Sequence, residues 1–259
     1  MINNIDIGAG SSSKPIGAEQ ASTTDKPELN EAATLPLFSA EQIKKSFFKG
    51  KKEIPVIRGV DLKIKPGELV AITGASGVGK STLLHILGTL EPPTSGRVLF
   101  GPKQENIFRL SEKALSIFRN RTLGFVFQFH YLLPEFTALE NVMMPILIAG
   151  YRRQDAEKQA KVLLDFVGLK DRMDHRPSEM SGGEQQRVAI ARAVILRPKL
   201  LLADELTGNL DSENCAMVME LLVRLNRSTG VSVLLVTHDQ ALASRMHRII
   251  VMKDGVFVH

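Results

Sequence analysis

The chain has 259 residues, enough for one substantial core with an appended subdomain and short for two full domains. Apolar residues make up 44% and charged residues 24%, as in ordinary globular proteins. The longest apolar stretches, such as residues 142–149, are far shorter than the roughly 20 residues that cross a bilayer, so we expect no membrane span. No signal-peptide pattern is visible, and Cys215 is the single cysteine, so we expect no internal disulfide and a cytoplasmic location.

The net charge of +5 raises the question of an anionic partner. Much of the excess comes from lysines between residues 44 and 52. No recognised nucleic-acid-binding motif accompanies them, and such charge runs are commonly solvated surface. We therefore expect no nucleic-acid partner.

The first 36 residues differ in composition from the rest. They are rich in Ser, Thr, Ala, Gly, Asn and Lys without a sustained apolar period, which predicts a disordered tail over residues 1–36 and one domain over residues 37–259. In that domain, short Val-, Ile- and Leu-rich runs alternate with helical segments, a pattern typical of a largely parallel sheet covered on both faces. The predicted strands are residues 69–72, 97–100, 123–127, 200–203, 231–236 and 249–252.

Residues 133–180 have a different pattern, which is mostly helical. Thr137 and Glu140 have the spacing of a capping box that opens a helical segment over residues 141–149. We predict a helical subdomain inserted between strands of the sheet, over about residues 133–180.

The most informative feature follows the strand at residues 69–72. Residues 74–82 read Gly-Ala-Ser-Gly-Val-Gly-Lys-Ser-Thr and precede an apolar helical segment, which predicts a phosphate-binding loop. Its glycines let N–H groups turn inward, and the helix N-terminus adds partial positive charge. Lys80 then reaches the β- and γ-phosphates, and Ser81 contacts Mg²⁺. The candidate nucleotide contacts of this loop are Gly74, Ala75, Ser76, Gly77, Val78, Gly79, Lys80, Ser81 and Thr82.

Two adjacent acids, Asp204 and Glu205, end the buried strand at residues 200–203. The carboxyl ends of strands are where open α/β sheets bind ligands. Because strand side chains alternate, we expect the two carboxylates to face opposite ways and to have different roles. One can orient hydrated Mg²⁺, while the other polarises a water molecule for attack on phosphorus.

Ser181-Gly-Gly-Glu184 precedes a segment whose apolar residues repeat at helical spacing. Ser181 and Glu184 fit a second capping box. Gly182 and Gly183 weaken a first helical turn, which favours the close approach of another molecule, and an anionic phosphate is the natural ligand at a helix start. The residues alone support a cap and a phosphate site equally.

In their order along the chain, these motifs resemble those of ABC transporter ATPases. Residues 180–193 are similar to the family's signature motif and lie at its usual interval before the acidic strand. Residues 207–211 resemble the D-loop, Gln128 the Q-loop glutamine and His238 the switch histidine. The resemblance covers residues 37–259 and implies ATP and Mg²⁺ as ligands. It implies catalytic roles for Glu205, His238 and Gln128, metal contacts for Ser81, Gln128 and Asp204, and nucleotide contacts for Ser181, Gly182, Gly183 and Asp211.

Within the family, residues 127–142 and 175–183 resemble the ATPase subunits of lipoprotein-releasing systems. Residues 203–211 fit the same group and its relatives in macrolide export and cell division. Leu206 departs from the proline that these families usually have, which puts the turn that positions Glu205 in question.

The resemblance implies an α/β fold, a P-loop NTPase core of ABC-ATPase type with an N-terminal antiparallel β-subdomain and a helical subdomain. It further implies a head-to-tail homodimer with two ATP molecules between the chains, in which the phosphate loop of one chain faces Ser181 and Gly183 of the other. By the same resemblance Phe47 stacks on adenine, although the adjacent Phe48 is an alternative.

The implied partners are two integral membrane subunits of the LolC/LolE type, bound at the cytoplasmic face of the inner membrane. Lipoprotein cargo would be reached only through them. Two alternatives stay open: the ATPase of a related macrolide-efflux or cell-division complex, and an ABC ATPase that clamps nucleic acid. The latter generally carry long coiled-coil insertions or two ATPase modules, and neither pattern is present in this sequence.

Overall fold

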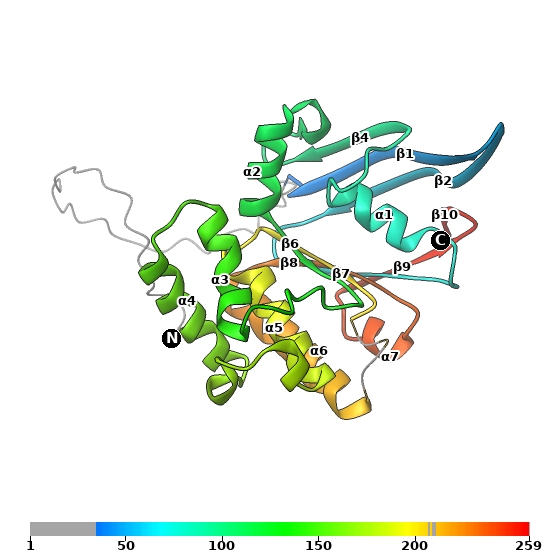
Figure 1. The fold of residues 1–259 in the computed structure, drawn as a ribbon. Helices are drawn as coiled ribbons and strands as arrows, with labels where there is room; N and C mark the ends of the chain where they lie inside the picture. The colour runs from blue at the N-terminus through cyan, green and yellow to red at the C-terminus, as the bar shows by residue number, and fades with distance from the viewer. Residues whose placement is uncertain (1–34, 207, 209–210, 259) are drawn as a thin grey trace, which may run out of the picture.

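A computed structural model describes residues 35–206, 208 and 211–258 of the chain. The tail predicted for residues 1–36 therefore lies almost entirely outside the described residues. Figure 1 shows two sheets, with α1 (Lys80–Leu87) between them and most of the longer helices on the far side of the larger sheet.

The larger sheet has six strands in the order β10-β9-β3-β8-β7-β6. All of its neighbouring strands are parallel except the edge pair β9 and β10. The strands are β3 (Leu69–Thr73), β6 (Leu123–Val126), β7 (Leu200–Asp204), β8 (Ser232–Thr237), β9 (Arg248–Lys253) and β10 (Val256–Val258). Each strand predicted from an apolar run lies at its predicted place to within about two residues. For β3, β7 and β8 the reason is that burial on both faces demands continuous Val, Ile and Leu.

The smaller sheet is antiparallel, in the order β2-β1-β4-β5. Its strands are β1 (Phe38–Lys49), β2 (Lys52–Ile64), β4 (Ser95–Phe100) and β5 (Glu105–Asn106). Side chains of β1, β2 and α1 form one core with one face of the larger sheet. This packing fixes the helix after the phosphate loop between the two sheets.

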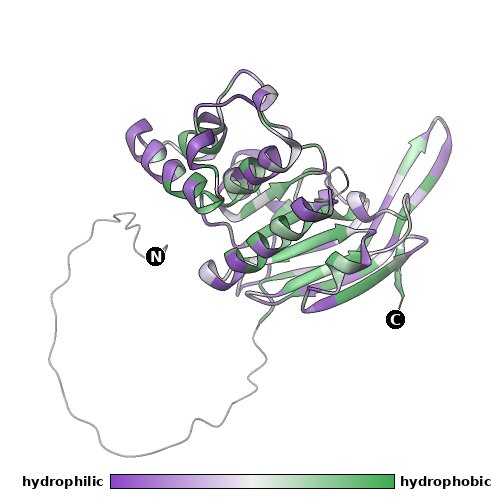
Figure 2. Ribbon diagram, turned by 90° about the horizontal axis from the view of Figure 1, so that it is seen from below, coloured by the Kyte–Doolittle hydropathy of each residue, from purple (hydrophilic) through white to green (hydrophobic). Residues whose placement is uncertain are grey.

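The second core lies on the other face of the larger sheet, under α3, α4, α5 and α6. Besides α1, the helices of the described chain are α2 (Glu112–Thr122), α3 (Ala138–Ile148), α4 (Arg153–Phe166), α5 (Gly182–Val194), α6 (Ser212–Thr229) and α7 (Gln240–Ala243), with short 3₁₀ turns at Ile107–Arg109, Lys170–Arg172 and Pro177–Glu179. Figure 2 shows the strands as the most apolar elements and α4 as largely polar on its outer side.

This arrangement confirms the predicted α/β class and the N-terminal antiparallel sheet. The predicted capping box of Thr137 and Glu140 is present at the start of α3. The structure places α3 and α4 within residues 133–180, where we predicted a helical subdomain; its boundaries stay a prediction. Among the described residues, the helices are all too short or too polar to cross a bilayer.

Candidate active site

The phosphate loop connects β3 to α1, as predicted. Gly74, Gly77 and Gly79 have φ values of 153°, 80° and 105°. Gly79 stands at the N-cap of α1, and a Cβ atom there would lie 2.8 Å from the Ile57 side chain. The loop therefore needs glycine both for its backbone angles and for its fit under β2.

Lys80 is buried, and its ammonium is held by its own loop. Nζ donates to the carbonyl oxygens of Gly74 (2.9 Å) and Ala75 (2.8 Å). These bonds use two of the three N–H donors of a lysine ammonium. The ammonium is thereby fixed beside the N-terminus of α1, where the backbone N–H groups and the helix dipole favour an anion.

Ser81 and Asp204 meet, although 123 residues separate them in sequence. Ser81 Oγ donates to Asp204 Oδ1 at 3.0 Å. Burial raises the pKa of the Asp204 carboxyl, and the bond from Ser81 and the charges of His85 and Lys80 act in the opposite direction. A partly buried carboxylate beside a hydroxyl is thus available at the carboxyl end of β7.

Glu205 lies beyond the end of β7, so the expectation that Asp204 and Glu205 face opposite ways as neighbours on a strand has to be corrected. Its φ of +43° is left-handed, so the alternation of strand side chains does not apply to it. Its N–H donates to the Val236 carbonyl of β8 at 2.9 Å, and its Oε1 lies 3.2 Å from His238 Nδ1. Asp204 and Glu205 do have different partners, but a backbone turn separates them rather than the pleat of a strand.

His238 directly follows β8, so two neighbouring strands bring it and Glu205 together. An ionised carboxylate only accepts hydrogen bonds, so the tautomer of His238 with a proton on Nδ1 is the one that can donate to Glu205. Gln128 follows β6, and its Nε2 lies 2.8 Å from where a Cβ of Gly208 would be. The three predicted catalytic residues thus come from the carboxyl ends of three adjacent strands.

The predicted phosphate site at the start of α5 is built differently. Ser181 Oγ accepts from the Glu184 N–H, Glu184 accepts from the Ser181 N–H, and Arg172 pairs with the Glu184 carboxylate at 3.1 Å. Ser181 and Gly182 are exposed, whereas Gly183 is buried. The capping box predicted at Ser181 is therefore present.

Gly183 has a structural reason of its own. A Cβ atom at this position would collide with the end of the Asn214 side chain, so an internal contact favours glycine while Asn214 keeps its position. Asn214 in turn donates to Asp211, which caps α6 and whose pKa these bonds lower. Thr207, Asn209 and Leu210 of the D-loop-like segment lie outside the described residues. The ligand roles predicted for Gly183 and Asp211 stay predictions.

The β1–β2 register separates Phe47 from Phe48. On β1, Phe47 lies two positions from Lys45, whose Nζ is 5.1 Å from the centre of the Phe47 ring, so these two side chains share one face of the hairpin. Their partners on β2, Ile54 and Ile57, are three positions apart because a register shift lies between the two pairs. Ile57 on that face contacts the phosphate loop at Gly79. Phe48 lies on the opposite face, which favours Phe47 as the adenine contact.

The residues near Ser81 fit Mg²⁺ in one particular way. Among the described residues, His, Cys, Asp and Glu form no cluster of three or more that could hold a metal. Ser81 and Asp204 supply a hydroxyl and one carboxylate. Magnesium commonly takes one or two carboxylates and completes its shell with water and substrate phosphates, so this pair suits Mg²⁺ bound together with a nucleotide.

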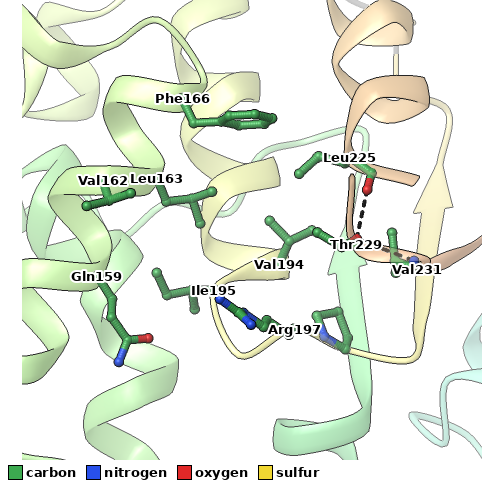
Figure 3. Close-up of a pocket in the computed structure, with 11 residues that line it drawn as sticks. Gln159, Val162, Leu163, Phe166, Val194, Ile195, Arg197, Leu225, Thr229 and Val231 are labelled. Carbon is green, nitrogen blue, oxygen red and sulfur yellow. Dashed lines mark hydrogen bonds between the residues drawn. The ribbon is translucent and has the colours of Figure 1, made fainter. Parts of the chain in front are cut away.

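An apolar pocket elsewhere in the molecule is separate from this site. Figure 3 shows Leu163 and Phe166 of α4 facing Val194 of α5 and Leu225 of α6 across it. Its lining includes Val231, just before β8 begins, so it lies toward the amino ends of the strands. Nucleotide-site candidates lie at the carboxyl ends.

Sequence reasoning missed several residues that shape the site. Asn214 fills the space beside Gly183, His85 lies near Asp204, and Arg192 holds the loop after Gln128. All three act across distances that helical or strand periodicity does not encode. A charged residue within the otherwise apolar pattern of residues 188–195 was the one available signal for Arg192.

The fold and this constellation define an ATPase of the P-loop class. A family model described as ABC transporter matches residues 57–208, more than half of the chain, so the protein belongs to the ABC transporter ATP-binding family. It is an ABC ATPase, as predicted.

The relatives narrow the group. The lipoprotein-releasing system ATP-binding protein LolD of Syntrophus aciditrophicus is 54% identical over 222 residues, which are 86% of this chain and 99% of that protein. LolD of Geobacter metallireducens is 56% identical over 85% of this chain and 96% of its own length. Among solved structures, the dimeric cassette MJ0796 bound to ADP and Pi is similar with a TM-score of 0.79 and 40% identity, over 86% of this chain and 97% of that one.

Proposed function

We propose that this chain is the ATP-hydrolysing subunit of an ABC complex that releases lipoproteins from the inner membrane toward the outer membrane. The observation that carries the proposal is the meeting of the phosphate loop, the Ser81–Asp204 pair and the Glu205–His238 pair at one edge of the sheet, in a chain more than half identical to LolD proteins over most of its length.

Each residue has a role that its surroundings support. The loop at residues 74–82 binds the phosphates, with Lys80 at the β- and γ-phosphates. Ser81 and Asp204 hold Mg²⁺ with Gln128, and the ion, when bound with nucleotide, neutralises charge on the phosphates. Phe47 stacks on adenine.

Glu205 acts as general base. Its carboxylate takes a proton from the attacking water, and His238 orients it through the contact at 3.2 Å. His238 also lies at the strand ends, where it can contact the γ-phosphate. The positive φ of Glu205 aims its side chain away from the path of β7, toward His238.

The chain works as a head-to-tail homodimer. Ser181, Gly182 and Gly183 at the start of α5, with Asp211, contact the ATP bound to the phosphate loop of the other chain. The MJ0796 cassette, similar over most of its length, is dimeric. Ser181 can accept from the Glu184 N–H and still donate its own proton to a phosphate, because a hydroxyl is both donor and acceptor.

The membrane partners are two integral subunits of the LolC/LolE type at the cytoplasmic face of the inner membrane. A surface for them lies after Gln128, where Phe129 and Tyr131 are 62% and 65% exposed, with Leu133 and Phe136 beside them in sequence. Exposed aromatic groups of this kind commonly mark protein interfaces. Cargo contacts the membrane subunits only.

Depletion of this protein in its own cell tests the proposal. We expect outer-membrane lipoproteins to accumulate in the inner-membrane fraction, and wild-type protein but not Glu205→Gln to restore their transfer. The variant controls for the mere presence of the subunit. Normal lipoprotein transfer together with failed division or drug efflux would assign the chain to a related ABC complex instead.

A further inference from the structure

The segment that follows Gln128 is tied to α5 by one side chain. Arg192 donates from Nη1 to the Tyr131 carbonyl and from Nη2 to the His130 carbonyl, both at 2.7 Å. Two bonds from one rigid guanidinium to adjacent carbonyls fix both the position and the orientation of that backbone. Arg192 is largely withdrawn from water, and this burial lowers its pKa.

The clamped backbone is strained. Tyr131 has a φ of +46°, which residues with a Cβ atom rarely adopt and which persists where surrounding contacts enforce it. The carbonyl of this same residue accepts the bond from Arg192 Nη1. The guanidinium therefore helps to enforce the turn that ends the loop.

A second contact from the same helix supports the clamp. Burial lowers the pKa of His130, and a polar interaction with the Gln185 side chain acts in the opposite direction, so Gln185 lies near the His130 ring. Gln185 and Arg192 are seven residues apart, two turns along one face of α5. Gln185 also donates to the carbonyls of Pro177 and Met180, so it is itself held in place. The loop thus lies along one face of α5.

On its other side the loop packs against aromatic rings. Phe127 stands edge-on to Tyr131, with ring centroids 5.4 Å apart, and is stacked on Phe125 at 5.7 Å. The His85 ring, from the helix that follows the phosphate loop, lies 6.3 Å from Phe127. Gln128 is therefore the residue between a ring anchored near α1 and a backbone anchored to α5.

We infer that Arg192 is a positioning residue that couples the Gln128 loop to α5, so that displacement of the start of α5 is transmitted to Gln128. The inference rests on the proposed roles of Gln128 and Ser181. Ser181 and Arg192 stand eleven residues apart, or about 16 Å along a rigid helix. One end of α5 faces the nucleotide of the partner chain, and the other end holds the loop of its own chain.

The test compares two arginines that both bind backbone carbonyls across elements. Arg192→Met removes the clamp. Arg224→Met is the matched control, because Arg224 of α6 donates to the Phe166 carbonyl at 2.6 Å and stacks on its ring, at the end of α4 rather than beside Gln128. Arg192→Lys serves as a milder variant that keeps the charge and lacks the fork.

Two readouts separate a positioning role from a loss of general stability. The first is ATP turnover by the full chain, measured as a function of Mg²⁺ concentration to give the half-saturating concentration. ATP affinity in the absence of Mg²⁺ is measured as its control. The second is local motion of a reporter: the chain has no tryptophan, so Phe129→Trp places a single one in the loop. Fluorescence anisotropy of this reporter then follows the loop in each background.

For Arg192→Met we expect turnover to fall roughly 10- to 100-fold, as misplacement of a catalytic group typically causes, with a raised half-saturating Mg²⁺ concentration and unchanged metal-free ATP affinity. Arg192→Lys should show a smaller change in the same direction. Faster reporter motion should accompany Arg192→Met and not Arg224→Met. Should Arg192→Met fail to fold, the lysine variant gives the same comparison.

Equal effects of Arg192→Met and Arg224→Met, or unchanged Mg²⁺ dependence in the former, would overturn the positioning role. Gln128→Ala separates this failure from failure of the proposed function. If Gln128→Ala lowers turnover while the Arg192 variants do not, the positioning role alone is wrong. If Gln128→Ala also leaves turnover unchanged, the proposed role of Gln128 is wrong, and the inference that depends on it is wrong as well.

Discussion

The starts of α1 and α5 both contain glycine, at the N-cap of α1 and at the first two helical positions of α5, yet they are built in opposite ways. The N-cap of α1 is Gly79, with a left-handed backbone, no side-chain cap and no acid in the first turn. The N-cap of α5 is Ser181, with a complete capping box and Glu184 in the first turn. The start of α1 has no side-chain cap, so its N–H groups are available to a ligand, whereas the start of α5 is capped by the side chains of Ser181 and Glu184.

The difference between the two helix starts bears on which of them can bind a phosphate within a single chain. At α1, Lys80 and the backbone N–H groups supply positive charge without a competing carboxylate in the first turn, which suits a phosphate. At α5, the N–H of Ser181 bonds to Glu184, and this bond is the main reason why the pKa of Glu184 is lowered. We therefore propose that the start of α5 contributes the Ser181 hydroxyl to a nucleotide bound mainly by another chain, rather than binding a phosphate alone.

The largest effect should come from Glu205→Gln. A general base commonly contributes about 10²–10⁴-fold, so turnover should fall by that order while ATP binding persists. With hydrolysis stopped, ATP should keep both helix starts engaged and the dimer assembled, which size-exclusion chromatography with light scattering would detect. Turnover close to that of the wild type would show that Glu205 is not the base.

A smaller effect is expected from Ser181→Ala. Loss of the cap should lower the free energy of unfolding by about 0.5–2 kcal/mol, measured by urea denaturation. In the Glu205→Gln background it should also weaken ATP-dependent dimerisation, while ATP affinity of the monomer stays unchanged.

Thr137→Ala is the matched control, because it removes the other capping box, at the start of α3, away from the proposed nucleotide contacts. It should cost similar stability without weakening the dimer. Equal loss of dimer in both variants would mean that Ser181 acts only as a helix cap.

Local determinants explain why much of this was predictable. The phosphate loop, both capping boxes and the buried strands each depend on residues within one short segment, so pattern and spacing suffice. The left-handed turn at Glu205, its contact with His238 and the approach of Gln128 to Gly208 were not predictable, because they depend on which strands lie side by side.

Leu206 illustrates the same limit. The sequence marked it as a departure from the proline usual in the family, and the structure shows its side chain 2% exposed within the core under α5 and α6. Its hydrophobic contacts come from residues distant in sequence. Only the packed structure therefore shows that Leu206 contributes to the core next to the turn at Glu205.

The central claim is that each nucleotide site is shared between two chains. Its most direct test uses two defective variants, Lys80→Ala and Ser181→Glu, each made in the Glu205→Gln background. The two variants are mixed, and the radiolabelled ATP that the protein retains is measured. Each variant alone should retain little. In a mixed dimer, the intact loop of one chain faces the intact α5 start of the other, so about a quarter of the wild-type sites should return after random exchange. No recovery in the mixture, with mixed dimers shown to form, would contradict a nucleotide site shared between two chains.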